Sequence, residues 1–520
     1  MSTSKGTAKL LRGSFLLMIS NLLFRVGGYV YRFLMARMLG PEGYGILGYT
    51  LFFQGVFQVL SAGGLPPAIA KYVSQHKALE EDQMASQVVF TSLKFMMFLG
   101  ILFSIVMFFI GPMIANNIWH KPAAALPLQA VALITPFSVI VGAFRGAFQG
   151  IYKMEYVVIT RAVEQVFMIV FAVILVMLGF YAAGAVIGTG IGFMASAVSA
   201  IIIFRKYMWK YLPSLDPEHK FNFRQELGLI KTLLIFSIPV IITALSEMSI
   251  YGASIFILGI FMATKFSGYY NAVDPIARLP LVISLSVATA VLPAASEAFA
   301  LKDKALLTTY IVQSYRMVVL TVLPLCIGIA IFSGPLLELL FGVNYVYGAG
   351  ALSILVIGMA FYTLFMVSSS IAQGLGYPRL PMYILVVGSV VNITLNWFLI
   401  QFYGIIGAAL ATTITAFVIM IPILWKTYKI TEVKLPFMSF AKITLASAVM
   451  GLGMFFIPQT IFGLILAIII APIIYVIAFT FLKGFEKRDI RMMRRMGTKL
   501  GPLSIINEKL VKFIEHYVEK

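Results

Sequence analysis

Four residues near the start of the chain repeat at the spacing of one helix face. Asn21, Arg25, Gly28 and Arg32 follow positions i, i+4, i+7 and i+11 within an apolar stretch, and at about 100° per residue they share one side of a helix. A planar guanidinium can bind two oxygens of a phosphate or carboxylate at once. The pattern therefore predicts an anion-binding face, and Gly28 is expected to let another group approach it closely.

Charged residues also occur in other long apolar stretches, where a charge costs about 2.5–3.5 kcal/mol at the bilayer centre. Bases outnumber acids there, which favours an anionic ligand. The residues predicted to line a cationic substrate cavity are Asn21, Arg25, Arg32, Arg145 and Arg278. Three acids are candidates to couple transport to Na⁺ or a proton: Glu164, Glu247 and Asp274. No catalytic residue, metal site or other cofactor is predicted.

Some of these charges could instead satisfy one another. Asp274 and Arg278 stand at i and i+4, and Arg161 and Glu164 at i and i+3, so each pair could be an intrahelical ion pair. Arg25 has no acid at these spacings and is predicted to line a water-filled path. Three bases lie near the inner ends of their spans and could reach the interface by snorkelling: Lys94, Arg145 and Arg316.

Composition places these residues in a membrane. The chain has 520 residues, of which 61% are apolar and 11% charged, and its mean hydropathy is +0.97. Soluble domains carry about 25% charged residues, so lipid is the expected solvent. The net charge of +19 is not interpreted as nucleic-acid binding, because its distribution follows the membrane topology. The partners expected from composition are membrane lipids, and no nucleic acid.

Apolar runs of about 20 residues predict fourteen spans, at 13–38, 44–66, 86–112, 124–148, 155–178, 182–204, 229–262, 266–298, 306–332, 346–372, 380–401, 405–426, 437–457 and 461–482. With the N-terminus in the cytoplasm, 29 of the 39 Lys and Arg residues fall in cytoplasmic segments or the span ends that adjoin them, and three in outer loops or the span ends that adjoin them. This asymmetry is typical of the positive-inside rule. It predicts a multi-pass protein of the cell membrane with both termini in the cytoplasm.

Short motifs recur along the chain. Gln149-Gly150 is followed by Gly184-Ala185, and Gln373-Gly374 is followed at similar spacing by Gly407-Ala408. The fold class predicted from this is all-α, with two six-helix pseudo-repeat lobes and two extra C-terminal helices. The predicted domains are an N-lobe (1–210), a C-lobe (211–430), appended spans (431–482) and a basic amphipathic cytoplasmic tail (483–520). Parallel repeats of this kind place a substrate site near the midplane between the halves.

Two stretches resemble one family. Residues 25–45, from Arg25-Val26-Gly27-Gly28 to Gly43-Tyr44-Gly45, and residues 269–293 are similar to the first-span and eighth-span regions of polysaccharide and lipid-linked oligosaccharide flippases. This SpoVB-, Wzx- and MurJ-like branch belongs to the MOP superfamily, which also holds the MATE exporters. The resemblance implies a central cationic cavity, alternating access and a polyprenyl-diphosphate sugar as substrate. It matches Arg25 and Arg32 to essential first-span arginines, and Asp274 and Arg278 approximately to charged positions of span 8.

The sequence therefore predicts a flippase, expected to be a monomer, that is driven by an ion or by the membrane potential. The alternative is a MATE-like cation-coupled multidrug exporter. A membrane glycosyltransferase or polymerase would need a large extramembrane loop, and the longest cytoplasmic connection, at about 205–228, is short. A non-transporting scaffold is a fourth hypothesis, against which the arginines within the spans argue. The segment 44–66 carries no charge, unlike the second span of lipid II flippases.

Overall fold

The chain folds as α-helices joined by short connections. The computed structural model describes the backbone of residues 2–215 and 221–486 together with Arg494, Glu508 and Glu515, and it describes side chains from Arg25 onward. No strand occurs in these residues, which confirms the predicted all-α class. The tail predicted for residues 483–520 lies mostly outside the described residues, and so does the side chain of Asn21.

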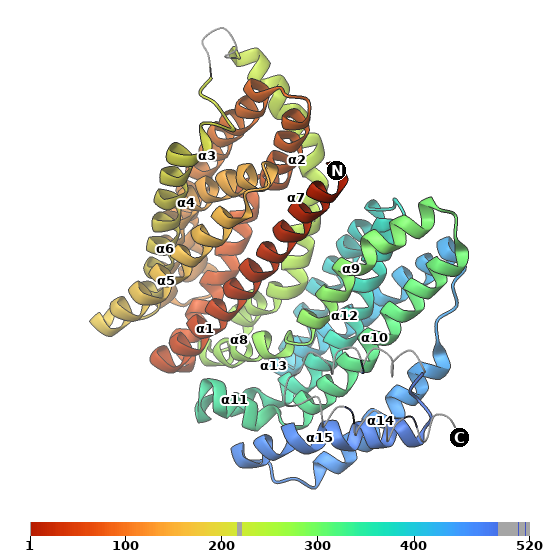
Figure 1. The fold of residues 1–520 in the computed structure, drawn as a ribbon. Helices are drawn as coiled ribbons and strands as arrows, with labels where there is room; N and C mark the ends of the chain where they lie inside the picture. The colour runs from red at the N-terminus through yellow and green to blue at the C-terminus, as the bar shows by residue number, and fades with distance from the viewer. Residues whose placement is uncertain (1, 216–220, 487–493, 495–507, 509–514, 516–520) are drawn as a thin grey trace. The chain divides into compact units, whose positions relative to one another are not determined.

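Two compact units make up the structure. Unit 1 comprises Met1–Ala272 with Leu385–Ala408, and unit 2 comprises Val273–Ile384 with Ala409–Lys520. The helices up to the boundary are α1 (Ser2–Ala62), α2 (Leu65–Ala78), α3 (Asp82–Met113), α4 (Ala125–Gly150), α5 (Met154–Leu175), α6 (Tyr181–Ile203), α7 (Phe223–Phe261) and α8 (Thr264–Ala277). They are followed by α9 (Leu281–Ala300), α10 (Lys304–Ile331), α11 (Ser333–Phe341), α12 (Ala349–Gly374), α13 (Arg379–Thr431), α14 (Phe437–Phe455) and α15 (Ile461–Phe481) (Figure 1).

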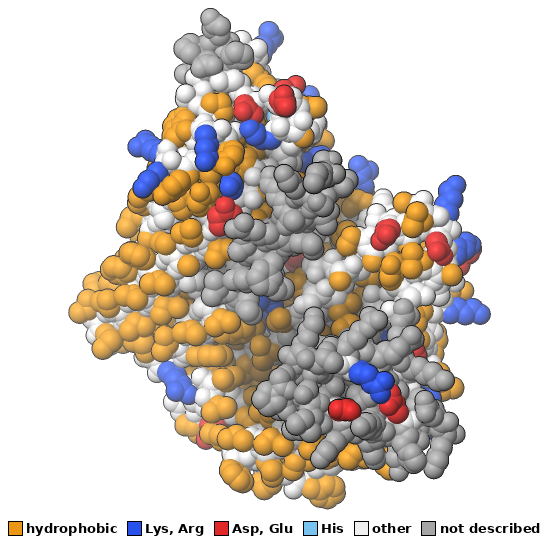
Figure 2. Space-filling model, viewed as in Figure 1, with side chains coloured by type: hydrophobic (Ala, Val, Ile, Leu, Met, Phe, Trp, Pro, Cys, Tyr) orange, Lys and Arg blue, Asp and Glu red, His pale blue; other side chains and the backbone are white. Residues whose placement is uncertain are grey.

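Eleven stretches of the described chain are long and apolar enough to cross a membrane. Hydrophobic side chains cover much of the described surface (Figure 2), as expected of a protein whose solvent is lipid. This is a multi-pass membrane protein. Three of the stretches are interrupted at glycines with positive φ, namely Gly40, Gly179 and Gly404, and each interruption falls in a predicted loop. Division there would give fourteen segments, but the number of spans stays a prediction.

The predicted span at 266–298 is not one continuous helix. The structure divides this stretch into α8 and α9, with a turn at Arg278–Pro280 between them. Proline lacks an N–H and disfavours the helical conformation in the residue before it, so a helix ends readily before Pro280. The carbonyl of Pro280 then accepts from the backbone N–H of Ile283 at 3.2 Å as α9 begins.

The core of unit 1 forms where α2 packs between α3 and α4. Leu65, Ile69 and Val73 on α2 are fully buried with Val89 of α3 and Phe148 of α4. Removal of such side chains from lipid or water into a close-packed interior favours one arrangement of the helices. In unit 2, a separate cluster joins α14 to α15 through residues such as Met450, Met454 and Leu464.

One packing feature recurs in both units. A Cβ added to Gly150 at the end of α4 would lie 2.9 Å from the carbonyl oxygen of Ala70 on α2, and one added to Gly374 at the end of α12 would lie 2.5 Å from that of Leu292 on α9. Both glycines follow a glutamine in the repeated motif, and both allow helix backbones to touch. The recurrence supports the repeat, although the predicted domain boundaries themselves stay a prediction.

Candidate functional site

The α1 face that carries Arg25 and Arg32 is not the face that packs against α5 and α6. Tyr31 is buried and donates its hydroxyl to the carbonyl of Ala185 on α6 at 3.1 Å. A Cβ on Gly27 would overlap the side chain of Gln165 on α5. Gly27 and Tyr31 lie about 100–160° around the helix from the arginines, so this packing leaves Arg25 and Arg32 on a different side of α1.

Both guanidiniums on this face are half-buried. Within the part of the chain that the structure describes, neither Arg25 nor Arg32 forms an ion pair or a side-chain hydrogen bond. No described atom lies within 4 Å of a Cβ added at Gly28, so the close approach of another group to this residue stays a prediction. At Gly27, one position away and on the packed face, a Cβ would meet the end of the flexible Gln165 side chain.

Lys94 and Arg316, two other bases within predicted spans, are each bound to a carboxylate. Lys94 binds Glu226 of α7 at 2.6 Å. Arg316 in unit 2 is 6% exposed, and it binds Glu486 at 2.5 Å and donates to the carbonyl of Gly484 at 2.7 Å. Arg316 is therefore anchored to the segment after α15.

Arg145 and Glu164 form a buried charge cluster inside unit 1. Arg145 on α4 donates to Glu164 of α5 at 2.8 Å and to Ser196 of α6 at 3.2 Å through Nη2, and to Thr160 at 3.1 Å through Nε. The Arg145 and Glu164 side chains are 14% and 3% exposed. The i, i+3 spacing allows Glu164 to pair with Arg161 in its own helix. In the structure the carboxylate binds Arg145 of the neighbouring helix and also interacts electrostatically with Arg161. The ion pair neutralises much of the charge of Arg145 and Glu164.

Asp274 and Arg278 do form the intrahelical pair that their spacing indicates. The pair lies in unit 2 at the end of α8, directly before the turn that interrupts the helix. Asp274 is 8% exposed. Interrupted helices at membrane depth are tolerated where the backbone is buried in protein or lines a cavity, and they recur at transporter binding sites.

Glu247 differs from the other two acids. It lies on α7 of unit 1 and is half-buried, and among the described residues it has no ion-pair partner. A pocket between α1 and α7 is lined by Gln58 and by small and apolar residues that include Ala244 and Met248, the latter next to Glu247 in sequence. The structure thus separates the three predicted coupling acids into two that are paired with arginine and one that is not.

Lys121 is a residue that the sequence analysis did not select. Its ammonium donates to the carbonyls of Gly259 and Met262, each at 2.7 Å, and to the Tyr49 hydroxyl at 3.0 Å. Burial lowers the pKa of Lys121 to about 8. The carbonyls lie at the C-terminal end of α7, which is favourable for a cation. The only signal in the sequence is that Lys121 is one of few bases in the predicted outer loops.

No group of three or more His, Cys, Asp and Glu side chains that could hold a metal ion occurs among the described residues. The geometry offers two half-buried guanidiniums on one face of an apolar helix. Such a site can bind an anion, since a guanidinium removed from bulk water gains from a phosphate or carboxylate partner.

Two protein families and several known proteins are similar to this chain. The polysaccharide biosynthesis protein family matches residues 10–299, and the MatE family matches residues 239–398. An uncharacterised membrane protein of Methanocaldococcus jannaschii is 28% identical over 78% of this chain and 95% of its own. The lipid II flippase MurJ of Bacillus subtilis is 24% identical over 78% of this chain and 80% of its own.

A solved structure of a lipid II flippase MurJ, in an inward closed conformation, is similar in fold. It covers 90% of this chain and 98% of its own, with a TM-score of 0.71 and 17% sequence identity. At this identity the similarity concerns the fold.

Proposed function

Because this chain belongs to the polysaccharide biosynthesis protein family of the MOP superfamily, we propose that it is a flippase for a lipid-linked saccharide. The family and its structural neighbours are transporters, and the chain is a transporter rather than an enzyme. The proposed substrate is a polyprenyl-diphosphate sugar, which moves from the cytoplasmic to the outer leaflet of the cell membrane by alternating access. The proposed topology has both termini in the cytoplasm, and the proposed working form is a monomer.

One observation carries this proposal. Of the bases within the predicted spans, Arg25 and Arg32 have no partner among the described residues, whereas Arg145 and Arg278 bind carboxylates in their own units. A diphosphate offers oxygens to both guanidiniums, while the lipid tail can stay in the bilayer. Arg25 and Arg32 are therefore the proposed diphosphate ligands. Arg145 and Arg278 become secondary candidates that would first have to leave their carboxylates.

The proposed drive is a proton or Na⁺ at Glu247, or the membrane potential, which contributes about 2.3 kcal/mol per charge per 100 mV. Glu247 is preferred over Glu164 and Asp274 because it has no ion-pair partner among the described side chains. A carboxylate that is already bound to arginine has less to gain from a coupling cation.

Native mass spectrometry of the purified protein tests the proposed site. Wild type, Arg25→Ala/Arg32→Ala and Arg37→Ala are each titrated with a polyprenyl-diphosphate sugar and with the same lipid lacking phosphate. Arg37 is an exposed arginine of the same helix and is the matched control. Binding that needs the diphosphate, persists in the Arg37 variant and is lost in the double variant supports the proposal. Equal binding by all three proteins would remove Arg25 and Arg32 from the site.

The MatE match to residues 239–398 supports a second candidate function, a cation-coupled drug exporter. Such a protein would bind organic cations and lower their accumulation in cells that overproduce it. Dye accumulation in cells that carry wild type or Glu247→Gln separates the two functions. Dye export that depends on Glu247, with no binding of the diphosphate lipid, would favour the exporter.

A further inference from the structure

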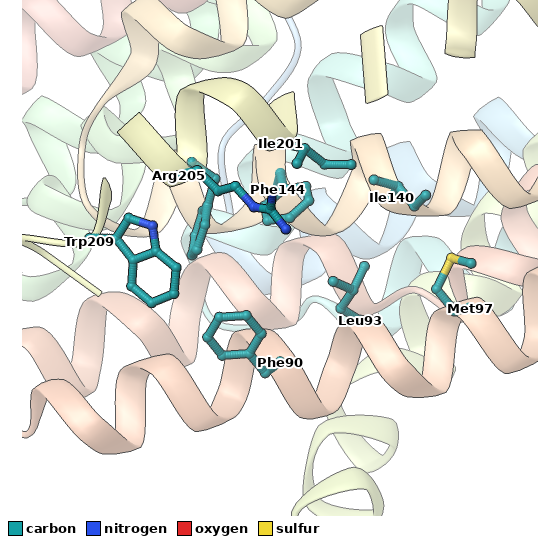
Figure 3. Close-up of a pocket in the computed structure, with 9 residues that line it drawn as sticks. Phe90, Leu93, Met97, Ile140, Phe144, Ile201, Arg205 and Trp209 are labelled. Carbon is teal, nitrogen blue, oxygen red and sulfur yellow. The ribbon is translucent and has the colours of Figure 1, made fainter. Parts of the chain in front are cut away.

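A pocket lies on unit 1 where the start of α3, the end of α4 and the end of α6 meet. Its volume is about 390 Å³. Phe90, Leu93 and Met97 form the α3 wall at intervals of three and four residues, and Ile140 and Phe144 face them from α4. Figure 3 shows these side chains on either side of the space. The wall from Phe90 to Met97 covers two helical turns, or about 10 Å, and is wholly apolar.

The pocket has one charged lining residue. Arg205 belongs to the π-helical turn η4 (Phe204–Met208) that ends α6, and its guanidinium reaches over the space rather than away from it (Figure 3). Arg205 has no ion-pair partner among the described residues. Lys94, on the same helix as the α3 wall, is by contrast paired with Glu226 of α7 at 2.6 Å.

Trp209 closes the same end of the pocket. Its indole is exposed and lies 6.2 Å from the ring of Phe204. Tryptophan favours the membrane–water interface, because its ring is apolar and its N–H can reach water. An apolar slot with a cation and a tryptophan at one end matches an amphiphile whose anionic head lies at the interface and whose tail lies deeper.

We propose that this pocket binds an anionic glycerophospholipid. Its phosphate binds Arg205, and one acyl chain lies along the wall formed by Phe90, Leu93 and Met97. Charge complementarity favours an anionic over a zwitterionic lipid, since the pocket has a cation and no acid in its lining. The site contains no residue of α1, so it does not depend on the diphosphate site proposed at Arg25 and Arg32.

The fluorescence of Trp209 reports occupancy directly. The protein carries four tryptophans, and in the Trp397→Phe/Trp425→Phe variant only Trp119 and Trp209 remain. Trp119 is 3% exposed and follows the opposite end of α3. Its background fluorescence is measured in a variant that also carries Trp209→Phe. Full-length protein in phosphatidylcholine nanodiscs receives increasing fractions of phosphatidylglycerol or phosphatidylcholine, each brominated near the top of one acyl chain.

The expected result is that brominated phosphatidylglycerol quenches Trp209 at about fivefold lower mole fraction than brominated phosphatidylcholine. One basic residue near an anionic lipid contributes about 1 kcal/mol of binding free energy, which corresponds to this ratio. Arg205→Gln should abolish this preference, and the neighbouring Lys206→Gln should keep it. Equal quenching by both lipids, or a preference that survives Arg205→Gln, would overturn the proposal.

A competition experiment distinguishes the proposed occupant from the transport substrate. Unbrominated phosphatidylglycerol should relieve the quenching, while a polyprenyl diphosphate at the same fraction should not. Relief by the polyprenyl diphosphate alone would overturn the phospholipid assignment. The Arg25→Ala/Arg32→Ala variant should retain the phosphatidylglycerol preference, so a failure of the lipid site and a failure of the transport site give different results.

Discussion

Gly268 of α8 lies directly against the carbonyl oxygen of Pro41 in α1, so that a Cβ on Gly268 would overlap that oxygen. The contact is reciprocal, because a Cβ on Gly45 of α1 would overlap the carbonyl oxygen of Thr264. Both neighbouring atoms belong to the backbone and cannot move aside as a side chain can. Just after its kink at Gly40, α1 therefore packs backbone to backbone against α8 within unit 1.

We expect Gly268→Ala to destabilise the protein by about 1–3 kcal/mol, the usual cost of overpacking. Gly228→Ala is the matched control, since a Cβ there meets nothing within 4 Å, and alanine is favoured over glycine in a helix by about 0.5–1 kcal/mol. Thermal unfolding in detergent measures both. An unchanged midpoint for Gly268→Ala would mean that α1 and α8 can separate at little cost.

The buried pair of Arg145 and Glu164 gives a second prediction. Glu164→Gln should cost about 3–5 kcal/mol, because it leaves the Arg145 charge uncompensated in a buried site. Arg145→Met with Glu164→Gln should cost less than the sum of the single changes. The pair Lys304 and Glu432 is 84% and 76% exposed, so Lys304→Gln should have little effect. Additive losses at Arg145 and Glu164 would contradict the pairing.

Unlike the Arg145–Glu164 pair, Arg25 and Arg32 should contribute to ligand binding and not to stability. Because neither has a partner among the described residues, Arg25→Gln should leave the unfolding midpoint nearly unchanged. It should weaken binding of a polyprenyl-diphosphate sugar at least about tenfold, the scale of one hydrogen bond to a charged group. Arg25→Lys keeps the charge but loses the bidentate geometry, so its affinity should lie between those of wild type and Arg25→Gln. Loss of folded protein in Arg25→Gln would instead indicate a structural role.

Lys121 predicts a pH dependence of stability. Burial lowers its pKa from 10.5 to about 8, so between these values the folded protein has released a proton that the unfolded chain still binds. Stability relative to Lys121→Met should therefore be constant below about pH 8 and should rise from there toward pH 10.5. The measurement is the difference between the unfolding midpoints of the two proteins across this range. A difference that is flat, or that falls with pH, would contradict the lowered pKa.

Several local features could be predicted because they depend on residues near one another in the chain. Long apolar runs predict the helices, and the predicted loops contain the kinks at Gly40, Gly179 and Gly404. The Asp274–Arg278 pair follows from i, i+4 spacing. The break before Pro280 was missed even though its signal, a proline inside a long apolar run, is local. Hydropathy outweighed it in the prediction.

The partners of the buried charges could not be predicted in this way. Glu164 has a base three residues away in Arg161, yet it binds Arg145 because α4 and α5 pack side by side. Gly28 and Gly27 are adjacent, and the side of α1 that packs against α5 decides which of them faces a neighbouring side chain. Lys121 is an ordinary loop lysine in the sequence, and only the folding of its loop onto the end of α7 places three acceptors around it.

The sequence by itself determined that this chain is a helical membrane protein with arginines in its first span, because apolar run length and helical spacing are properties of consecutive residues. The tertiary structure decided which charges are neutralised within a unit and which have no ion-pair partner among the described residues. That outcome depends on contacts between helices distant in sequence, where a shift of one residue around a helix axis turns a side chain by about 100°.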